Sequence, residues 1–310
     1  MVLLGVVTSH YEQVHFYQQN TRTVPPSSRS LCYKISMANE QARPTVAMTI
    51  AGSDSGGGAG IQADLKTFAA HGVYGTSAIT AVTAQNTQTV AGVSQLTPEM
   101  IGLQVDTVFE DIVVDAVKTG MLATSPIIEV VARKLGELRV DKVVVDPVMV
   151  SKSGDRLLQP EAVKSLRDEL VPRALLVTPN LPEAEALVGF PLRDETSIHA
   201  AARRIVEMGA RAVVVKGGHA TGDMCVDWLY DGRRFMSFTA PRLSVRNTHG
   251  TGCTFSAAIT AQLALGVTLE KAVEIAKAYL TKALENGLPL GRGHGPVDHF
   301  IGQKVWPESD

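Results

Sequence analysis

The fold of this chain is decided by the stretch Asn247-Thr248-His249-Gly250-Thr251-Gly252-Cys253-Thr254-Phe255-Ser256, where a loop turns into a helix. Its glycines leave the backbone open to a ligand. The first N–H groups of a helix lack intrahelical partners and lie at the positive end of the helix dipole, so this start is typical of an anion site. The same position favours the thiolate form of a cysteine. The alternative is a small-residue turn that packs a buried helix, and this segment alone leaves both open.

Composition limits the classes of protein to consider. The chain has 310 residues, of which 45% are hydrophobic and 19% charged, which is typical of a globular protein with a substantial core. A net charge of −2 gives no electrostatic reason to expect a nucleic-acid or membrane-surface partner. The three cysteines, Cys32, Cys225 and Cys253, form neither a CxxC motif nor a disulfide framework, which indicates a reducing, cytoplasmic compartment. The apolar runs are too short to span a membrane.

Residues 1–44 differ from the rest of the chain. They lack a sustained apolar period and contain Pro25-Pro26-Ser27-Ser28, so we expect a poorly ordered extension. The apolar start Val2–Val7 is short and has no basic residues before it, which argues against a signal peptide. Met37 stands just before the first convincing strand and is the expected translation start. Residues 45–310 are expected to form a single domain.

Strand and helix patterns alternate through that domain. Strands are expected at Val46–Ala51, Ser77–Thr83, Asp115–Thr119, Lys142–Val145, Leu175–Thr178 and Ala212–Lys216. Helices are expected between them, among them Glu161–Leu170 and Ile198–Met208, with two more after Gly250 and over Leu269–Leu284. This order predicts βαβ units and a mainly parallel sheet covered on both faces. Met224–Tyr230 and Arg234–Thr239 are expected to form an appended β-hairpin.

Polar and glycine residues follow the expected strands. In open α/β sheets ligands bind beyond the carboxyl ends of the strands. Those ends carry Gly52 to Asp54, Gln85-Asn86, Gly120-Met121, Asp146, Asn180 with Glu183, and Lys216 to His219. Each residue taken singly is explained by a helix cap or a turn, whereas the set favours an enzyme site. The loop Gly52–Gly60 lacks the Lys-Ser/Thr of a P-loop and does not fit GxGxxG, so it is better explained as an exposed backbone for a small ligand.

The chemistry of this set indicates phosphoryl transfer. Asn180 and Glu183 offer hard oxygen ligands suited to a hydrated Mg²⁺ near phosphates. The alternative for Glu183 is that its negative charge stabilises the positive end of a helix dipole. Lys216 would neutralise phosphate oxygens, and the helix start after Gly250 would bind the transferred group. Hydride transfer is disfavoured because the dinucleotide fingerprint is absent.

Several motifs, in order over about residues 45–300, resemble the hydroxymethylpyrimidine/phosphomethylpyrimidine kinases of the ribokinase superfamily. They are Thr49-Ile50-Ala51-Gly52-Ser53-Asp54, Gly57-Gly58-Ala59-Gly60-Ile61-Gln62-Ala63-Asp64, Thr83-Ala84-Gln85-Asn86-Thr87, Lys118-Thr119-Gly120-Met121, Asp146-Pro147-Val148-Met149, Thr178-Pro179-Asn180-Leu181-Pro182-Glu183, Lys216-Gly217-Gly218-His219, His249-Gly250-Thr251-Gly252-Cys253-Thr254 and Gly293-His294-Gly295-Pro296-Val297. One departure is Gly56, where many members carry serine.

The resemblance implies a ribokinase-like three-layer α/β/α fold and a homodimer. It implies Mg²⁺- and ATP-dependent phosphorylation of 4-amino-5-hydroxymethyl-2-methylpyrimidine and then of its monophosphate, on the route to thiamine diphosphate. The implied substrate pocket contains Gln85, which would pair with the aminopyrimidine edge, together with Gly52, Ala59, Asp64, Thr83, Met121 and Val148. The implied phosphate sites are the anion hole Gly250, Thr251, Gly252 and Cys253, the nucleotide residues Lys216, Asn180 and Asp146, and the metal residues Glu183 and Asn180.

Cys253 stands where many relatives have an aspartate base. A thiolate there would take the alcohol proton in the first phosphorylation, whereas the second acceptor is already a phosphate and needs no base. The closest rival function is a pyridoxal or pyridoxine kinase on the same scaffold, against which Gln85 and Met121 favour the pyrimidine. A non-catalytic pyrimidine-binding protein is a rival of another class, and the complete set of phosphate residues argues against it.

Overall fold

A computed structural model of the chain describes residues 43–151, 154–219 and 222–301. The expected extension, residues 1–44, lies outside the described residues apart from its last two positions, and so do the expected translation start Met37 and residues 302–310. No helix within the described ranges is long and apolar enough to cross a membrane.

The described residues form one nine-stranded sheet in the order β3-β2-β1-β4-β5-β6-β7-β8-β9. Its strands are β1 Val46–Asp54, β2 Tyr74–Gln85, β3 Val90–Gln95, β4 Ala116–Thr119, β5 Val143–Val145, β6 Leu176–Val177, β7 Val213–Val215, β8 Met224–Tyr230 and β9 Phe235–Pro241. Strands β2, β1, β4, β5, β6 and β7 are parallel, and each joins its neighbour through a crossover. The antiparallel pairs lie at the two edges, where β3 joins β2 and the hairpin β8–β9 joins β7. The mainly parallel sheet with an added hairpin is therefore confirmed.

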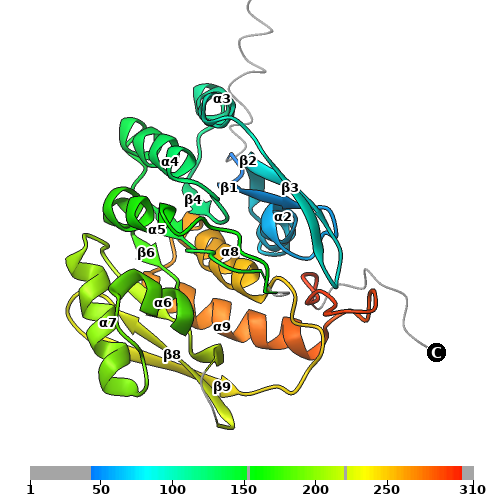
Figure 1. Cartoon of the computed structure of the whole chain (residues 1–310), viewed down its shortest axis with the longest axis vertical. Helices are drawn as coiled ribbons and strands as arrows, with labels where there is room; N and C mark the ends of the chain where they lie inside the picture. The colour runs from blue at the N-terminus through cyan, green and yellow to red at the C-terminus, as the bar shows by residue number, and fades with distance from the viewer. Residues whose placement is uncertain (1–42, 152–153, 220–221, 302–310) are drawn as a thin grey trace, which may run out of the picture. The chain divides into compact units, whose positions relative to one another are not determined.

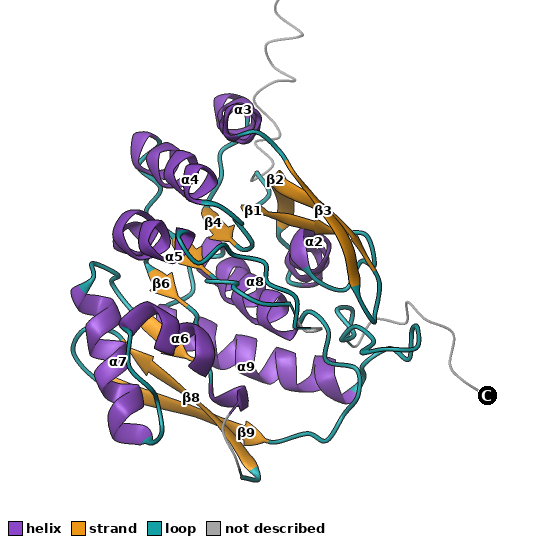
Figure 2. Ribbon diagram, in the orientation of Figure 1, coloured by secondary structure: helices purple, strands orange, loops and turns teal. Residues whose placement is uncertain are grey.

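Helices cover both faces of the sheet (Figures 1 and 2). One face is covered by α3 Pro98–Asp111, α4 Ser125–Glu137, α5 Ala162–Ser165, α6 Leu181–Val188 and α7 Glu195–Glu207. The other face is covered by α2 Gly60–Ala70, α8 Thr251–Ala264 and α9 Leu269–Glu285. The result is the expected three-layer α/β/α arrangement.

Sequence patterns explain which helices lie inside. Helix α4 buries Ile127, Val131 and Leu135 on one stripe and leaves a polar face to solvent, as a surface helix does. Helix α8 is buried from Thr254 to Ala264 because the sheet covers one side and α9 the other. Its Phe255 packs with Val144 of β5 in the same core cluster. The buried part of α8 is thus held between the sheet and α9, and its partly exposed first turn extends from this fixed helix.

The order of the strands predicts where a ligand binds. The chain runs from β1 outward to β2 and β3, then returns to the other side of β1 with β4 and continues in the opposite direction. The change of direction lies between β1 and β4, and the crevice at such a point holds the ligand in open α/β sheets. Gly52 to Asp54 of β1 and Gly120-Met121 after β4 lie at this crevice.

Two elements differ from expectation. Strand β3 was not predicted, because its residues are mostly exposed and show no apolar alternation; it is held by pairing with β2 after a turn in which the Asn86 side chain accepts the N–H groups of Gln88 and Thr89. The helix expected over Glu161–Leu170 is only one α-helical turn, Ala162–Ser165, which continues as a π-helical turn, Leu166–Leu170.

Candidate active site

A cavity of about 440 Å³ lies at the carboxyl ends of the strands. It is lined by residues from β1, β2, the ends of β4 to β7, and the first turn of α8. Fourteen of the fifteen predicted site residues line it: Gly52, Ala59, Thr83, Gln85, Met121, Asp146, Val148, Asn180, Glu183, Lys216, Gly250, Thr251, Gly252 and Cys253. The sheet topology therefore brings together residues that are up to two hundred positions apart in the sequence.

The predicted anion hole is the first turn of α8. Gly250 is the N-cap residue and has a φ of 81°, in the left-handed region that favours glycine. A Cβ there would lie 1.8 Å from the carbonyl oxygen of Gly58, so the glycine loop after β1 packs directly on this turn. The hydroxyl of Thr251 donates to the carbonyl of Thr248 at 2.6 Å. As first-turn residues, Gly252 and Cys253 have N–H groups without intrahelical acceptors, which are free to bind an anion.

The thiol of Cys253 differs from the sequence-based expectation. The helix start was expected to favour the thiolate, but burial raises the pKa of Cys253 to about 11, and the positive charge of Lys118 offsets this only in part. Desolvation of a charged sulfur thus outweighs the helix dipole. In the ligand-free site the thiol is protonated at neutral pH.

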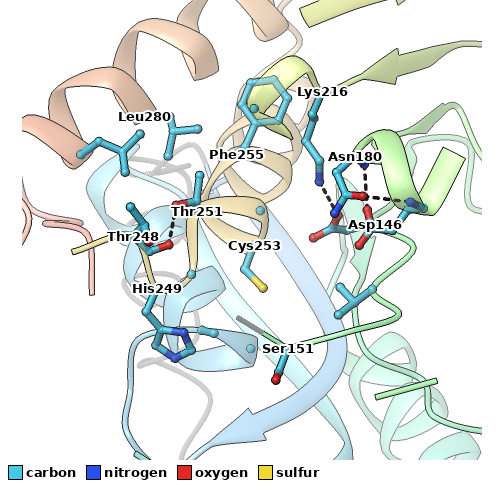
Figure 3. A pocket seen from close by; sticks show the side chains of 18 of the residues that line it. Asp146, Ser151, Asn180, Lys216, Thr248, His249, Thr251, Cys253, Phe255 and Leu280 are labelled. Atoms are coloured by element: carbon cyan, nitrogen blue, oxygen red, sulfur yellow. Dashed lines mark hydrogen bonds and ion pairs between the residues drawn. The ribbon is translucent and has the colours of Figure 1, made fainter. Parts of the chain in front are cut away.

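Lys216 and Asp146 form a buried ion pair beside the anion hole. Their Nζ and Oδ1 atoms lie 3.0 Å apart, and the hydroxyl of Ser256 in α8 donates to Asp146 Oδ2 at 3.2 Å. Burial works against the carboxylate of Asp146, but the charges of Lys216 and Lys118 outweigh it and hold the pKa of Asp146 below its ordinary value. A Cβ on Gly252 would lie 3.5 Å from Lys216 Nζ, so the cation and the anion hole are adjacent. Figure 3 shows Lys216, Asn180 and Asp146 together beside the start of α8.

Asn180 and Glu183 form a capping box at the start of α6. The Asn180 side chain accepts the N–H of Glu183 at 2.9 Å, and Glu183 Oε2 accepts the N–H of Asn180 at 2.8 Å. Burial raises the pKa of Glu183 to about 7, even though Lys216 attracts its negative charge. The alternative role considered for this pair, helix capping, is therefore present in the structure.

Glu183, predicted with Asn180 to bind a hydrated Mg²⁺, shares the cavity with a second carboxylate, Asp146. Among the described residues no group of three or more His, Cys, Asp and Glu side chains is arranged as a metal site. Mg²⁺ in nucleotide sites uses one or two carboxylates, keeps several waters and binds the phosphates of the substrate. Asp146 and Glu183 both line the cavity, and burial together with the negative charge of Asp146 raises the pKa of Glu183, so a cation bound between them would stabilise both carboxylates.

Gln85 is held by its backbone. Its N–H donates to the hydroxyl of Ser55 at 2.8 Å, and the same hydroxyl donates to the carbonyl of Gln85 at 2.9 Å. Its side-chain amide lies 3.1 Å from the hydroxyl of Thr83. Met121 and Val148 supply apolar surface in the same cavity, and a Cβ on Gly52 would lie 3.1 Å from the Met121 sulfur. The amide of Gln85 together with the apolar side chains of Met121 and Val148 suits a flat aromatic ring with polar substituents.

Asp64 is a correction to the predicted pocket. Its side chain is fully buried in α2 and does not line the cavity. Both of its carboxylate oxygens contact Lys118 Nζ, at 2.9 and 2.8 Å, and Thr49 donates to it at 2.6 Å. Burial works against the ammonium of Lys118, but Asp64 outweighs it and the pKa of Lys118 is raised. Lys118 reaches the cavity and Asp64 lies behind it, so Asp64 acts on the site through Lys118.

Sequence reasoning missed two further ion pairs at the cavity. Asp54 contacts His249 at 2.8 Å, and Lys277 of α9 contacts Asp227 of β8 at 2.7 Å. Asp227 also accepts the N–H of Gly217, the residue after Lys216, at 2.8 Å. A charged residue in the middle of an apolar strand, such as Asp227, was the one available signal, because the partners lie far away in the sequence.

The three-layer α/β/α fold, with a glycine-framed helix start beside the Lys216–Asp146 pair, is typical of small-molecule kinases of the ribokinase type. Residues 54–298 match the phosphomethylpyrimidine kinase family. The chain belongs to this family.

Similar proteins support this family assignment. The hydroxymethylpyrimidine/phosphomethylpyrimidine kinase of Bacillus subtilis is 52% identical over 82% of this chain and 94% of its own length. The thiamine biosynthesis bifunctional protein ThiED of Geobacter sulfurreducens is 53% identical over 82% of this chain, which spans 52% of that longer protein. Among solved structures, an ADP complex of Bacillus subtilis pyridoxal kinase is similar, with a TM-score of 0.78 and 42% identity over 83% of this chain and 98% of that one.

Proposed function

We propose that this chain transfers the γ-phosphoryl group of ATP to the hydroxymethyl group of 4-amino-5-hydroxymethyl-2-methylpyrimidine, and then to the resulting monophosphate, in thiamine diphosphate biosynthesis. The observation that carries the proposal is the position of the Lys216–Asp146 pair directly against Gly252 of the anion hole, in the same cavity as the Gln85 amide. Family membership and the relatives' names support the substrate.

In the proposed mechanism the two ends of the cavity have different tasks. The amide of Gln85 would pair with the exocyclic amine and a ring nitrogen, over the apolar surface of Met121 and Val148. The N–H groups of Gly252 and Cys253 would stabilise negative charge on the transferred phosphoryl group, and Lys216 the phosphates of ATP. The alcohol oxygen attacks the γ-phosphorus, the bond to the β-phosphate oxygen breaks, and ADP leaves. Mg²⁺ held near Glu183, Asn180 and Asp146 would supply further neutralisation of phosphate charge.

The proton of the alcohol is the difference between the two steps. In the first step it must leave the attacking oxygen, and the proposed acceptor is the thiolate form of Cys253, a minor fraction of the thiol at neutral pH. In the second step the attacking oxygen belongs to a phosphate that is already ionised at neutral pH, so positioning suffices. We also propose, from the alternating strand and helix pattern, that residues 45–310 form one domain, and from the cysteine pattern that the chain is cytoplasmic. On the family resemblance we propose that it is a homodimer.

We expect Cys253→Ala to slow the first phosphorylation by about 100-fold and the second by less than about threefold, since general-base catalysis contributes on this scale. With a thiol pKa of about 11, the thiolate fraction rises with pH throughout the range from pH 7 to 9. The rate of the first step divided by that of the second should therefore rise about tenfold per pH unit in the wild type and stay flat in the variant.

Glu183, with a pKa of about 7, also titrates in this pH range and should affect both steps equally. Its effect therefore cancels in the ratio of the two rates. Equal losses in both steps, or a ratio that is independent of pH in the wild type, would reject Cys253 as the base.

We expect Gln85→Leu to raise the KM of the pyrimidine by about 10- to 30-fold, because two hydrogen bonds of ordinary strength are lost. The KM of ATP should stay within about twofold, since Gln85 is not among the residues proposed to bind ATP. Gln95→Leu, on the exposed end of β3, is the matched control and should behave as the wild type. A Gln85→Leu enzyme with an unchanged pyrimidine KM would remove Gln85 from the substrate site.

The proposed function is tested by coupled ADP release with Mg²⁺ and ATP, offering the hydroxymethylpyrimidine, its monophosphate and pyridoxal separately. Turnover of both pyrimidines is the expected result. Turnover of pyridoxal alone would assign the chain to vitamin B6 salvage. If none of the three compounds causes ADP release, the chain would instead be a non-catalytic pyrimidine-binding protein.

A further inference from the structure

We propose that the Asp54–His249 pair is a positioning element that fixes the distance between the Gln85 amide and the anion hole. The proposal rests on the function proposed above for what the two ends of the cavity bind. Neither residue is assigned a role by the family resemblance, and both line the cavity.

Asp54 organises the glycine loop after β1. Its Oδ1 accepts the N–H of Gly56 at 2.8 Å, and its Oδ2 accepts those of Gly58 at 3.0 Å and Ala59 at 2.9 Å. The side chain is 3% exposed, so this carboxylate is satisfied by the protein and not by water. The loop has few side chains of its own, and its shape therefore depends on Asp54.

His249 brings a distant segment to the same carboxylate. Its Nε2 lies 2.8 Å from Asp54 Oδ2, across 195 positions of sequence. An ionised carboxylate can only accept, so Nε2 carries the proton in this bond. The backbone of His249 is fixed as well, because its N–H donates to the carbonyl of Gly295 at 3.0 Å and its carbonyl accepts the N–H of Val297 at 3.3 Å. The next residue along the chain is Gly250, the N-cap of α8.

These contacts form one continuous connection between the two ends of the cavity. Gln85 is bonded to Ser55, and Ser55 adjoins Asp54 in the chain. Asp54 is bonded to His249, which adjoins Gly250. The loop after β1 and the segment before α8 also pack closely at two glycines. A Cβ on Gly58 would lie 2.4 Å from the His249 ring, and one on Gly250 would lie 1.8 Å from the Gly58 carbonyl oxygen. The ring-binding amide and the anion hole are thereby held at one separation.

That separation decides the rate because the acceptor oxygen must lie in line with the transferred phosphorus. A misplacement of about 1 Å costs on the order of 100-fold in rate. Binding of each substrate alone depends on one end of the cavity and is much less sensitive. Loss of the pair should therefore lower kcat and leave both KM values nearly unchanged.

The kinetic test compares His249→Ala with His249→Gln, whose amide N–H can still donate to Asp54. We expect kcat to fall about 100-fold in His249→Ala and less than about tenfold in His249→Gln, with KM for ATP and for the pyrimidine within about threefold of the wild type. His294→Gln, a histidine in the neighbouring segment that bonds the Arg246 carbonyl, is the control and should match the wild type. A folded His249→Ala with unchanged kcat, a change confined to KM, or equal losses in the two His249 variants would overturn the proposal.

A second readout needs no substrate. Hydrogen–deuterium exchange should show faster exchange of residues 54–62 in His249→Gln, and more so in His249→Ala, although the substitution lies in the other segment. Unchanged exchange of residues 54–62 in His249→Gln would overturn the proposal even where His249→Ala does not fold. Failure of the proposed function is recognised separately, as a wild type that does not phosphorylate the pyrimidines, and the exchange result stands in that case.

Discussion

Replacing Lys216 by methionine is expected to lower kcat/KM for ATP by about 10³-fold, because the site would lose the cation that we propose to bind the phosphates of ATP. The substitution also leaves the carboxylate of Asp146 buried without its partner, and an uncompensated buried charge costs about 3 kcal/mol of unfolding free energy. The double variant Lys216→Met/Asp146→Asn should recover most of that stability without recovering activity. Steady-state kinetics and thermal unfolding measure the two effects separately.

Lys134→Met is the matched control for this result. Lys134 also forms an ion pair, with Asp106 at 2.6 Å, but it lies on the far face of the sheet in α4 and should leave kcat/KM within about twofold. A Lys216→Met enzyme that keeps kcat/KM within threefold would show that Lys216 serves only to stabilise the fold.

Replacing Gly250 by alanine is the second change with a large expected effect. The left-handed φ of 81° costs an alanine about 1 kcal/mol, and the added Cβ would collide with the Gly58 carbonyl at 1.8 Å, so the backbone of the anion hole must move. We expect kcat to fall by at least about 100-fold.

Gly266 provides a control with the same backbone strain. Its φ is 82°, and a Cβ there would meet nothing within 4 Å. Gly266→Ala should therefore lose about 1 kcal/mol of stability and keep its kcat. The difference between the two variants isolates the contact between the glycine loop and α8. Equal losses of stability and activity in both variants would contradict the account of the anion hole.

The parts of the site that the sequence predicts are local. Glycines at a helix start and polar residues at strand ends are visible as short patterns, and the parallel sheet places them at one edge. Gln85, Lys216 and Gly250 were predicted in this way, and all three line the cavity. The same patterns indicated the layers and the β8–β9 hairpin.

What the sequence does not predict depends on distant partners. Asp64 resembled a pocket residue, but Lys118, 54 positions away, draws it into a buried pair behind the cavity. His249 meets Asp54 across 195 positions, a contact that no local pattern indicates. The pKa of Cys253 was expected in the wrong direction, because desolvation depends on the packing around the thiol and not on its place in the helix. Strand β3 likewise forms because it pairs with β2, and its sequence shows no alternation of apolar and polar residues.

We propose that one cavity catalyses two successive phosphorylations of a pyrimidine. The most direct measurement follows a single reaction of the hydroxymethylpyrimidine, ATP and Mg²⁺ by phosphorus NMR. The account predicts that the resonance of the monophosphate ester rises first and is then replaced by the two coupled resonances of the diphosphate, and that Lys216→Met abolishes both stages. A reaction that stops at the monophosphate with excess ATP, or that gives no phosphorylated pyrimidine, would contradict it.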